Sequence, residues 1–422
     1  MPLLYSSFWP NNLMPENYPS PDAAVADVWR LLDERVAPLE YSRAPLEEAR
    51  GRLLGEDVRA DADQPPFDRS AVDGYALAPG ASHSRYRVVG VVKAGQVAAR
   101  PPGPGEALRI FTGADVPGTG LAIVMQEDVR AEGDFIHVGQ PPAPGENVRY
   151  RGSDAKAGDV LLKAGVRLNP VAMALLASVG LTRPLINGAP RIAHATTGDE
   201  IVPPDQTPGP GQIRNSNQAL IAALLKNYGW TSNPVHQEHW GDDPVRAAAR
   251  FAAEPFASAD LILVSGGASV GDHDYAARVL EGAGFELPIR KVNARPGRPL
   301  LVGFRGSQLV FGLPGNPVSH FVCFHLFVQR ALTRMLRLDA RKWLGFPLTE
   351  ALPAASNRRP TYWPGVLEQG SRHGVRPLPW NNSGHLAALV EASVLFLVPP
   401  GTPALPAGAK VDTLIIGPPM RP

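Results

Sequence analysis

The chain has 422 residues, of which 44% are hydrophobic, and its formal net charge is +1. At roughly 100–200 residues per domain, this length allows about two to four domains with substantial cores. The nearly balanced charge excludes a broad basic surface for nonspecific nucleic-acid binding, so any anion site must be local.

The single cysteine, Cys323, excludes an internal disulfide and a cysteine-based metal site. The residues before the first basic residue, Arg30, lack the charged start of a signal peptide. Apolar stretches such as 321–328 are too short to cross a bilayer. We therefore expect a cytoplasmic protein without a membrane segment or a nucleic-acid partner.

The N-terminal part predicts two helices followed by a region of strands. Ser20-Pro21 resembles a helix start, and apolar residues recur at helical spacing up to Val36. A second, short helix is expected over Leu46–Leu54. Residues 58–158 are rich in Gly, Pro and Val and carry alternating runs such as Tyr86–Val92 and Ile136–Val138. This pattern predicts a β-rich domain.

Residues 188–338 alternate apolar strands with helical segments, which predicts a parallel, doubly wound sheet. The expected strands are Arg191–Thr196, Leu261–Val264, Leu300–Val302 and Leu309–Phe311, and the expected helices are Ser216–Tyr228, Asp243–Ala253, Tyr275–Ala283 and Val318–Leu336. Residues 339–422 hold many prolines and short strands such as Val394–Val398 and Val411–Ile416, which predicts a small β-barrel or sandwich.

Three glycine-bearing loops follow apolar strands of the predicted sheet, beginning at Thr197, Ser265 and Gly312. Ligands of open parallel sheets bind beyond the carboxyl ends of the strands, and glycine lets the backbone approach an oxyanion there. Such loops are also ordinary tight turns. Three of them in one domain indicate a phosphate-bearing ligand as strongly as they indicate turns.

Carboxylates accompany these loops at Asp199, Glu200, Asp272 and Asp274. Carboxylates beside phosphates repel them unless a hard cation lies between, which makes Mg²⁺ a candidate. The alternative for each carboxylate is a helix cap, especially for the two that precede Tyr275.

A basic cluster of Lys291, Arg295 and Arg298 suits a tetrahedral oxyanion, although a solvated edge strand explains it equally simply. Taken alone, the polar segment around Asp73 and the charged segment from Arg149 to Asp154 are interpreted as ordinary turns. The histidines offer no third ligand for a metal, and no common hydrolase or P-loop motif is present.

In order along the chain, the residues resemble the MoeA/gephyrin E-domain family of molybdopterin molybdenumtransferases from about residue 22 to 416. The motifs that carry the resemblance are PPFDRSAVDGYAL (65–77), RIFTGADVPGTGLAIVMQED (109–128), NVRYRGSDAKAGDVLLKAG (147–165), TTGDEIVPP (196–204), GPGQIRNSNQALIAALL (209–225), DLILVSGGASVGDHDY (260–275), KVNARPGRPL (291–300) and VFGLPGNPVSHFV (310–322).

The resemblance implies a multidomain α/β protein with four parts. These are a doubly wound MoaB/MogA-like α/β domain (20–40 and 188–338), an elongated linking domain (41–57 and 159–187), a β-rich second domain (58–158) and a C-terminal β-barrel (339–422). It also implies a homodimer whose active cleft lies between the α/β domain of one subunit and the β-rich domain of the other.

The activity implied by the resemblance is molybdenum insertion into adenylyl-molybdopterin, with Mg²⁺-dependent cleavage of the adenylate and release of AMP. Molybdate and adenylyl-molybdopterin are the substrates. A molybdopterin adenylyltransferase would supply the pterin substrate, and molybdoenzymes or their chaperones would accept the product. Two alternatives remain: an adenylyltransferase, and a gephyrin-like binding scaffold.

The resemblance also implies roles for individual residues. Glu200, Asp272 and Asp274 would hold Mg²⁺, and the catalytic set would be Asp73, Thr112, Arg149, Asp154, Glu200 and Asp274. Substrate would contact Gly198, Asp199, Ser216, Gly266, Gly267, Gly271, Gly312, Pro314, Gly315 and Asn316, with Arg295, Arg298, Ser319 and Arg359 around molybdate or the pterin phosphate.

This chain departs from the family pattern at two places. The family often has lysine where Arg295 and Arg298 stand, so the geometry of the molybdate site is expected to differ. Near the C-terminal helix the family commonly shows Gln-Gly-Ser, whereas residues 381–385 read Asn-Asn-Ser-Gly-His. The altered order puts a role for Ser383 in doubt.

Overall fold

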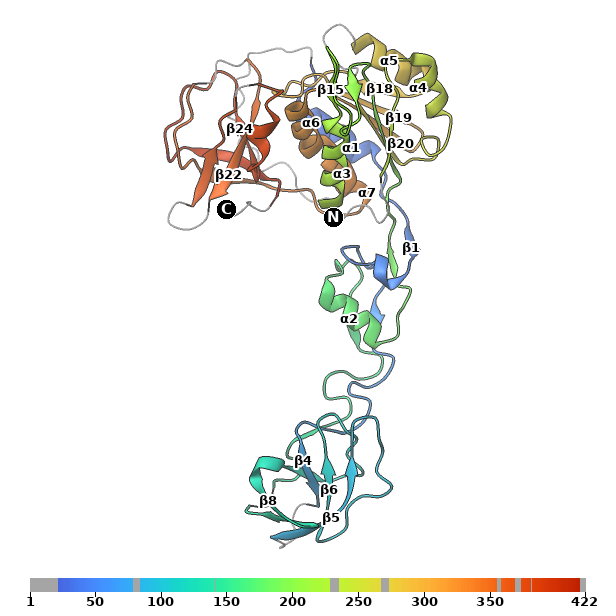
Figure 1. Cartoon of the computed structure of the whole chain (residues 1–422), viewed down its shortest axis with the longest axis vertical. Helices are drawn as coiled ribbons and strands as arrows, with labels where there is room; N and C mark the ends of the chain where they lie inside the picture. Colours follow the sequence, from blue (N-terminus) through green and yellow to red (C-terminus); the bar gives the residue numbers. More distant parts are fainter. Residues whose placement is uncertain are drawn as a thin grey trace. The chain divides into compact units, whose positions relative to one another are not determined.

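The computed structural model describes residues 22–78, 84–140, 142–227, 235–266, 273–354, 358–368, 373–380 and 382–417, with only the backbone for 273–275. The chain forms two compact units (Figure 1). One contains the residues up to Ser42 together with those from Asn187 on, and the other contains Arg43–Ile186. Each unit is described by itself.

The first unit is built on a six-stranded sheet in the order β16-β13-β17-β20-β19-β18. Neighbours from β16 to β20 run parallel. The strands are β13 (Ile192–Thr196), β16 (His236–His239), β17 (Leu261–Ser265), β18 (Glu286–Ile289), β19 (Leu301–Arg305) and β20 (Gln308–Leu313).

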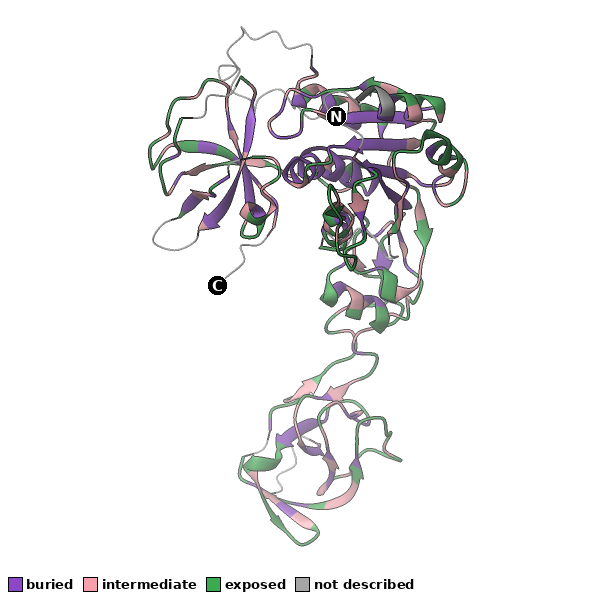
Figure 2. Ribbon diagram, turned by 45° about the horizontal axis from the view of Figure 1, so that its top comes forward, coloured by how far each residue is buried: buried purple, intermediate pink, exposed green. Residues whose placement is uncertain are grey.

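Helices cover both faces of this sheet, because alternate residues of each strand point to opposite sides. Leu261 and Leu263 of β17 belong to one apolar cluster, whereas Ile262 and Val264 belong to another. The first cluster includes α1 (Val25–Arg35), α3 (Ser216–Asn227), α6 (Pro317–Cys323) and α7 (Gln329–Met335), and the second includes α4 (Pro244–Phe251) and α5 (His273–Gly282). The buried strands between the helices are seen in Figure 2.

The expectation of a wholly parallel sheet was wrong at one edge, where β19 pairs antiparallel with both β20 and β18. Only Gly306 and Ser307 separate β19 from β20, and Gly306 has a φ of 59°. A parallel crossover needs a dozen or more residues, so a two-residue turn can only join antiparallel strands.

Two expected helices differ from the structure at their ends. The first helix begins at Val25 rather than near Ser20, because Ala23 is extended and pairs with Val292. The second is reduced to one 3-10 turn, Leu46–Glu48. There Gly51 has a φ of 78°, and Leu53 and Leu54 form bridges with Arg167 and Ile186 instead of continuing a helix.

The expected helix 318–336 is present as α6 and α7 joined by a π-helical turn, Phe324–Val328. All residues of this turn are buried. They share one core with residues of the C-terminal region such as Leu395 and Leu414. The C-terminal region therefore packs on the α/β sheet's helical layer within the first unit.

The C-terminal strands form a curled sheet in the order β21-β25-β24-β22-β23. A bridge between Leu348 and Val375 brings its two edges together, as in a barrel. The strands are β21 (Trp343–Pro347), β22 (Thr361–Glu368), β23 (Gly374–Pro377), β24 (Val394–Val398) and β25 (Lys410–Ile415).

The second unit contains a six-stranded sheet in the order β7-β4-β6-β5-β9-β8 and a separate small core around α2 (Pro170–Ser178). The strands of the sheet are β4 (Gly74–Leu77), β5 (Arg85–Val92), β6 (Glu106–Ile110), β7 (Ala122–Met125), β8 (Val129–Glu132) and β9 (Phe135–Val138). The short strands are β1 (Tyr41–Arg43), β2 (Val58–Arg59), β3 (Arg69–Ser70), β10 (Val148–Arg149), β11 (Val160–Leu162) and β12 (Leu185–Asn187), while β14 (Ile201–Val202) and β15 (Ile213–Arg214) belong to the first unit.

Among the described residues, no helix combines the length and the apolar character that crossing a membrane requires.

Candidate functional site

The three predicted glycine loops meet at the carboxyl edge of the parallel strands. The Thr197 amide donates to the Ser265 carbonyl at 2.9 Å, and the Gly266 amide donates to the Leu313 carbonyl at 3.2 Å. The loops that follow β13, β17 and β20 are thus joined in a row, as adjacent parallel strands require. Gly267, Gly271 and Asp272 lie outside the described residues.

Glycine is required by the backbone at two positions of this loop edge. Gly198 and Gly266 have φ values of 115° and 103°, which side chains rarely adopt. A Cβ at Gly266 would also lie 2.7 Å from the Thr197 carbonyl oxygen. Gly315 lies close to Gly266, while Gly312 is inside β20, against Leu301. Glycine at these two positions is therefore required by the backbone conformation and by the close packing of neighbouring loops.

Two buried oxygen atoms at this edge have no hydrogen-bond partner within the described part of the chain. They are Thr197 Oγ1 and Asn217 Oδ1. The amide nitrogen of Asn217 donates to the Gly315 carbonyl at 2.7 Å, which fixes the side chain against the loop. Its neighbour Ser216, the first residue of α3, is exposed. A ligand with hydrogen-bond donors would satisfy these atoms.

The carboxylates of the first loop are exposed. Asp199 accepts a hydrogen bond from the Asp242 amide at 3.1 Å, whereas Glu200 forms no ion pair with any described residue. The backbone of Asp274 is in α5, but its side chain is outside the description. The described residues contain no group of three potential ligands that could hold a metal. The expected Mg²⁺ site therefore stays a prediction.

Three arginines come together at a second place in the same unit. Arg295 pairs with Thr361 through the backbone, which brings it beside Arg359, whose guanidinium donates to the Ala294 carbonyl at 3.3 Å. Arg298 forms an ion pair with the buried Asp22 at 2.6 Å. Arg295 and Arg298 are close in the sequence, and the pairing of Arg295 with Thr361 of β22 brings the distant Arg359 to them.

Electrostatic repulsion marks this arginine cluster, which we define as Arg295, Arg298 and Arg359. Burial lowers the pKa of Arg359 from its ordinary value, and the positive charges of Arg298 and Arg295 lower it further, against the opposite effect of Asp22. Arg298 is paired with Asp22, whereas Arg295 and Arg359 form no ion pair with any described residue, which leaves two positive charges. A dianion is the ligand that would balance them.

Further residues connect the arginine cluster to the glycine loops. The guanidinium of Arg295 lies 5.6 Å from the centre of the Trp380 ring, within cation–π range. The Asn316 amide donates to Ser383 Oγ at 3.0 Å. Ser319 is buried in α6, and its carbonyl faces Gly297 in the arginine turn. Pro314 and Gly315 immediately precede α6, so this helix lies between the third glycine loop and the arginine turn and connects them.

The sequence predictions missed three residues of this region. Asp22 was assigned to a helix, Trp380 carried no motif, and a role for Ser383 was doubted because of the altered residue order. Ser383 nevertheless forms two hydrogen bonds. Its hydroxyl accepts from the side-chain amide of Asn316, and its carbonyl accepts from the backbone amide of Val318 at 3.1 Å. A lone acidic residue close to a core helix was the only sequence signal for Asp22.

The predicted residues of the second unit form two pairs. Asp73 Oδ1 accepts hydrogen bonds from Thr112, from both the amide and the hydroxyl, each at 2.7 Å. These bonds lower the pKa of Asp73 below its ordinary value. Arg149 forms an ion pair with Asp154 at 2.7 Å. Both pairs are partly or fully exposed and available to a ligand.

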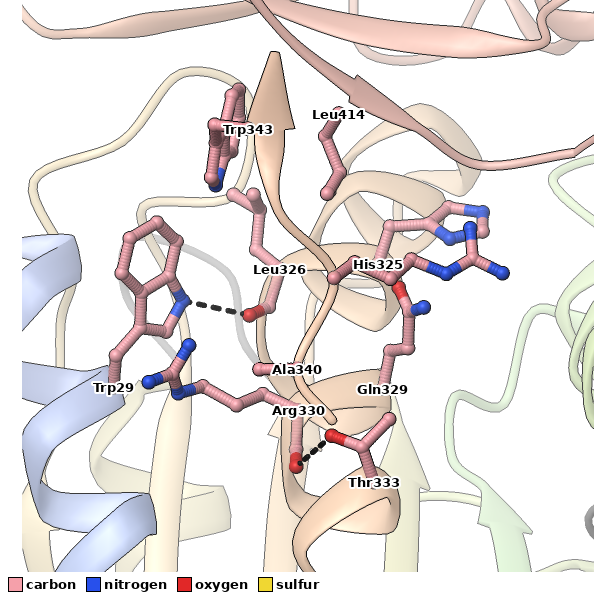
Figure 3. A pocket seen from close by; sticks show the side chains of 10 residues that line it. Trp29, His325, Leu326, Gln329, Arg330, Thr333, Ala340, Trp343 and Leu414 are labelled. Carbon is pink, nitrogen blue, oxygen red and sulfur yellow. Dashed lines mark hydrogen bonds between the residues drawn. The ribbon is translucent and has the colours of Figure 1, made fainter. Parts of the chain in front are cut away.

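A small pocket elsewhere in the first unit does not fit a substrate. It lies between α1, the π-helical turn and the C-terminal strands and is lined by Trp29, Leu326, Trp343 and Leu414 among others (Figure 3). The Trp29 indole donates to the Leu326 carbonyl at 2.8 Å across it. Its volume of about 30 Å³ suits one water molecule, so the pocket is a packing gap.

Family comparisons cover most of the chain. The MoeA N-terminal region (domain I and II) matches residues 23–180, the probable molybdopterin binding domain matches 193–334, and the MoeA C-terminal region (domain IV) matches 346–416. The expected multidomain α/β fold is thereby confirmed. The residue boundaries expected for its four parts remain predictions.

Relatives agree with these matches over nearly the full length. The molybdopterin molybdenumtransferase of Nostoc sp. is 32% identical over 96% of this chain and 91% of its own, and that of Staphylococcus aureus strain Mu50 is 31% identical over 88% and 90%. A crystal structure of a MoeA protein from Pyrococcus horikoshii superposes with a TM-score of 0.69 at 26% identity, covering 93% of this chain and 100% of its own. The chain therefore belongs to the molybdopterin molybdenumtransferase family and is an enzyme of that family.

Proposed function

We propose that this enzyme inserts molybdenum from molybdate into adenylyl-molybdopterin and releases AMP. The observation that carries the proposal is the arginine cluster, in which Arg298 is paired with Asp22 while Arg295 and Arg359 form no ion pair with a described residue and keep two uncompensated positive charges. Molybdate is a tetrahedral dianion, and the fork of a guanidinium suits its oxygens. Arg295, Arg298 and Arg359 would bind and orient it.

The glycine loops would bind the diphosphate and the nucleotide of the pterin substrate. Gly198, Gly266 and Gly315 would lie beside the diphosphate at the carboxyl edge of the strands, and the unpaired oxygens of Thr197 and Asn217 would accept hydrogen bonds from donor groups of the nucleotide. Substrate contacts are also proposed for Asp199, Ser216, Gly267, Gly271, Gly312, Pro314, Asn316 and Ser319.

Glu200, Asp272 and Asp274 would hold Mg²⁺. The fit rests on Glu200, a hard oxygen ligand that is exposed and that no described cation neutralises. Bound Mg²⁺ would offset the negative charge of the diphosphate oxygens. The residues of this chain would position the two substrates.

We further propose a homodimer in which Asp73, Thr112, Arg149 and Asp154 act together with the first unit of the partner subunit. Support comes from the family resemblance, and Asp73 and Arg149 are held in place by Thr112 and Asp154 within their own unit. A molybdopterin adenylyltransferase would supply the substrate, and molybdoenzymes or their chaperones would take the product.

The test is a molybdate titration of AMP release, followed by mass spectrometry, with Mg²⁺ present and after its removal by a chelator. Arg295→Gln should raise the molybdate concentration for half-maximal release at least about tenfold, because a charged hydrogen bond contributes about 1.5–3 kcal/mol. Arg295→Lys should keep most of the function, since the charge is retained. Removal of Mg²⁺ should stop AMP release.

Arg298 needs a paired design, because Arg298→Gln alone would leave the buried Asp22 without its cation. The double variant Arg298→Gln, Asp22→Asn removes this ion pair and keeps the net charge of the cluster, so it tests the hydrogen bonds of the Arg298 guanidinium rather than its charge. Arg191→Gln is the matched control, since Arg191 is an exposed arginine of the same unit that is paired with Asp260 and lies outside the cavity lined by Asp22 and Arg298. An unchanged molybdate dependence in both cluster variants would contradict the proposed anion site.

The same measurement separates the alternatives. An adenylyltransferase would consume ATP and form adenylyl-molybdopterin, whereas a binding scaffold would release no AMP. The adenylyltransferase alternative also leaves the matched N-terminal and C-terminal MoeA regions unexplained.

A further inference from the structure

A continuous chain of buried polar side chains lies directly beneath the glycine loops. His194 Nε2 is 2.6 Å from Ser265 Oγ, and Ser265 Oγ is 3.5 Å from His320 Nε2. Gln237 Nε2 is 3.0 Å from His194 Nδ1 at one end, and His320 Nδ1 is 3.2 Å from the Pro314 carbonyl at the other. His194, Ser265 and His320 are at most 2% exposed.

The direction of every hydrogen bond in this chain follows from its two ends. Gln237 Nε2 also contacts the Gln218 carbonyl at 2.8 Å, and a carbonyl only accepts, so this atom is the amide nitrogen and donates to His194 Nδ1. His194 must then carry its proton on Nε2 and donate to Ser265. At the other end, the Pro314 carbonyl requires the proton of His320 on Nδ1.

The two ends agree on a single arrangement. His320 Nε2 is left as an acceptor, and the Ser265 hydroxyl, which accepts from His194, donates to it. Each donor has an acceptor and both histidines are neutral in this arrangement, whereas a doubly protonated His320 would leave the Ser265 hydroxyl proton without an acceptor in the network. Burial independently favours the neutral rings, since it lowers the pKa of His194 to about 3 and that of His320 to about 4.

Three members of the chain lie in elements that adjoin the loops, and the fourth, Gln237, lies in the neighbouring strand β16. His194 is in β13, before the Gly198 loop, and Ser265 ends β17, before Gly266. His320 is in α6 and holds the carbonyl of Pro314, in the loop that follows β20. The backbone joins neighbouring loops one pair at a time, whereas this chain spans all of them from below.

We propose that Gln237, His194, Ser265 and His320 form a positioning network that fixes the spacing of the three glycine loops for substrate binding. This role rests on the proposed function of the loops. Because buried donors and acceptors are costly to leave unpaired, displacement of one loop breaks a bond in the network and is resisted by the others. The network residues act through the loops and do not touch the substrate.

The experiment compares Ser265→Ala with the conservative Ser265→Thr, which keeps the hydroxyl. Hydrogen–deuterium exchange of the full-length protein without ligand is measured over residues 197–200 and 313–316. Ser265→Ala should increase exchange in both segments, and Ser265→Thr should do so less. Gln237→Met is a second variant at the far end of the network, and it should increase exchange at 313–316 without direct contact with that loop.

Ser393→Ala is the matched control, because Ser393 is also a buried serine whose hydroxyl accepts a backbone hydrogen bond, at 2.8 Å from Leu367, within the C-terminal sheet. Kinetics of AMP release provide the second readout. Ser265→Ala should raise KM for adenylyl-molybdopterin about tenfold with kcat changed less than about twofold, since substrate and transition state use the same loops. Ser393→Ala should change neither.

Unchanged exchange in both Ser265→Ala and Gln237→Met would overturn the proposal, as would an equal increase in Ser393→Ala. Increased loop exchange with an unchanged KM would also overturn it, because the network would then stabilise the fold without positioning substrate. If the unaltered protein releases no AMP, the proposed function fails, and the exchange comparison still decides whether the network holds the loops.

Discussion

At the residue scale, Asp73 shows how one neighbour sets the charge of a proposed catalytic group. The amide and the hydroxyl of Thr112 both donate to one carboxylate oxygen, and these bonds lower the pKa of Asp73. The backbone bond makes the larger contribution and the side-chain bond the next. The carboxylate therefore stays ionised to a lower pH than an ordinary aspartate does.

Thr112→Val removes the hydroxyl donor and keeps the amide. The pKa of Asp73 should rise, because a hydrogen bond to its charged form is lost. The acid-side decline of kcat/KM for AMP release should therefore move to higher pH, as measured below pH 5, because the pKa of Asp73 is lowered from the ordinary value of 3.8. Thr112→Ser retains the donor and should keep the profile of the unaltered enzyme. If kcat/KM declined at the same acidic pH in both variants, the Thr112 hydroxyl would not contribute to lowering the pKa of Asp73.

The buried histidines predict a pH dependence of stability. The unfolded chain binds protons at the ordinary histidine pKa of 6.5, whereas the folded values are about 3 for His194 and about 4 for His320. Their contribution is thus fully present above pH 6.5 and is lost as the pH falls from 6.5 towards 4. Each should cost about 1 kcal/mol of unfolding free energy between pH 7 and 5.5.

Calorimetry of the first unit's unfolding transition at these two pH values checks this expectation. The groups that face the histidines are the Gln237 amide, the Ser265 hydroxyl, the Pro314 carbonyl and the other ring. None of the first three titrates in this range. His194→Leu should reduce the pH dependence by its own share. If His194→Leu lost as much stability between the two pH values as the unaltered protein does, groups other than His194 would account for the pH dependence.

At the scale of elements, a single glycine allows strands β4 and β7 to pair closely. A Cβ at Gly74 would lie 2.0 Å from the Val124 carbonyl oxygen, so the backbone would have to move. Gly74→Ala should therefore destabilise the second unit by about 1–3 kcal/mol. Thermal unfolding of the purified protein, followed at the transition of this unit, provides the measurement.

Gly345→Ala is the control for that prediction. Gly345 is also a strand residue, in β21, but nothing lies within 4 Å of an added Cβ. Alanine there should be neutral or stabilising by up to about 1 kcal/mol, because glycine loses more backbone entropy on folding. Similar effects of the two substitutions would mean that the close contact at Gly74 does not determine pairing.

At the scale of the whole molecule, the proposed homodimer predicts complementation between inactive subunits. Asp73→Ala removes a residue of the second unit, and Asp274→Ala removes a proposed metal ligand of the first. A mixed dimer should contain one intact site if the two units of a site come from different subunits. AMP release should recover partly after the two inactive variants are mixed and subunit exchange is confirmed by mass spectrometry.

The control is a mixture of Asp73→Ala with the double variant Asp73→Ala, Asp274→Ala, in which no intact site can form. Recovery in that mixture would point to residual activity rather than complementation. A lack of recovery in the first mixture, with exchange confirmed, would contradict a site shared between subunits.

The sequence by itself determined the periodic elements and their layers. Most predicted strands and helices of residues 188–338 are present, because apolar residues at a period of two or 3.6 can be buried in only one way. Loops after strands β13, β17 and β20 were foreseeable too, since parallel strands end at one edge. The hairpin of β19 and β20 was also signalled by its two-residue turn, which the prediction overlooked.

Only the tertiary structure decided which distant residues meet. Arg359 reaches Arg295 because β22 pairs with the arginine turn, and Asp22 reaches Arg298 because Ala23 pairs with Val292. His194 and His320 lie 126 positions apart, and no local pattern relates them. Periodicity records whether a residue is buried, but the partner of a buried polar group is set by packing between elements, which single-sequence spacing does not encode.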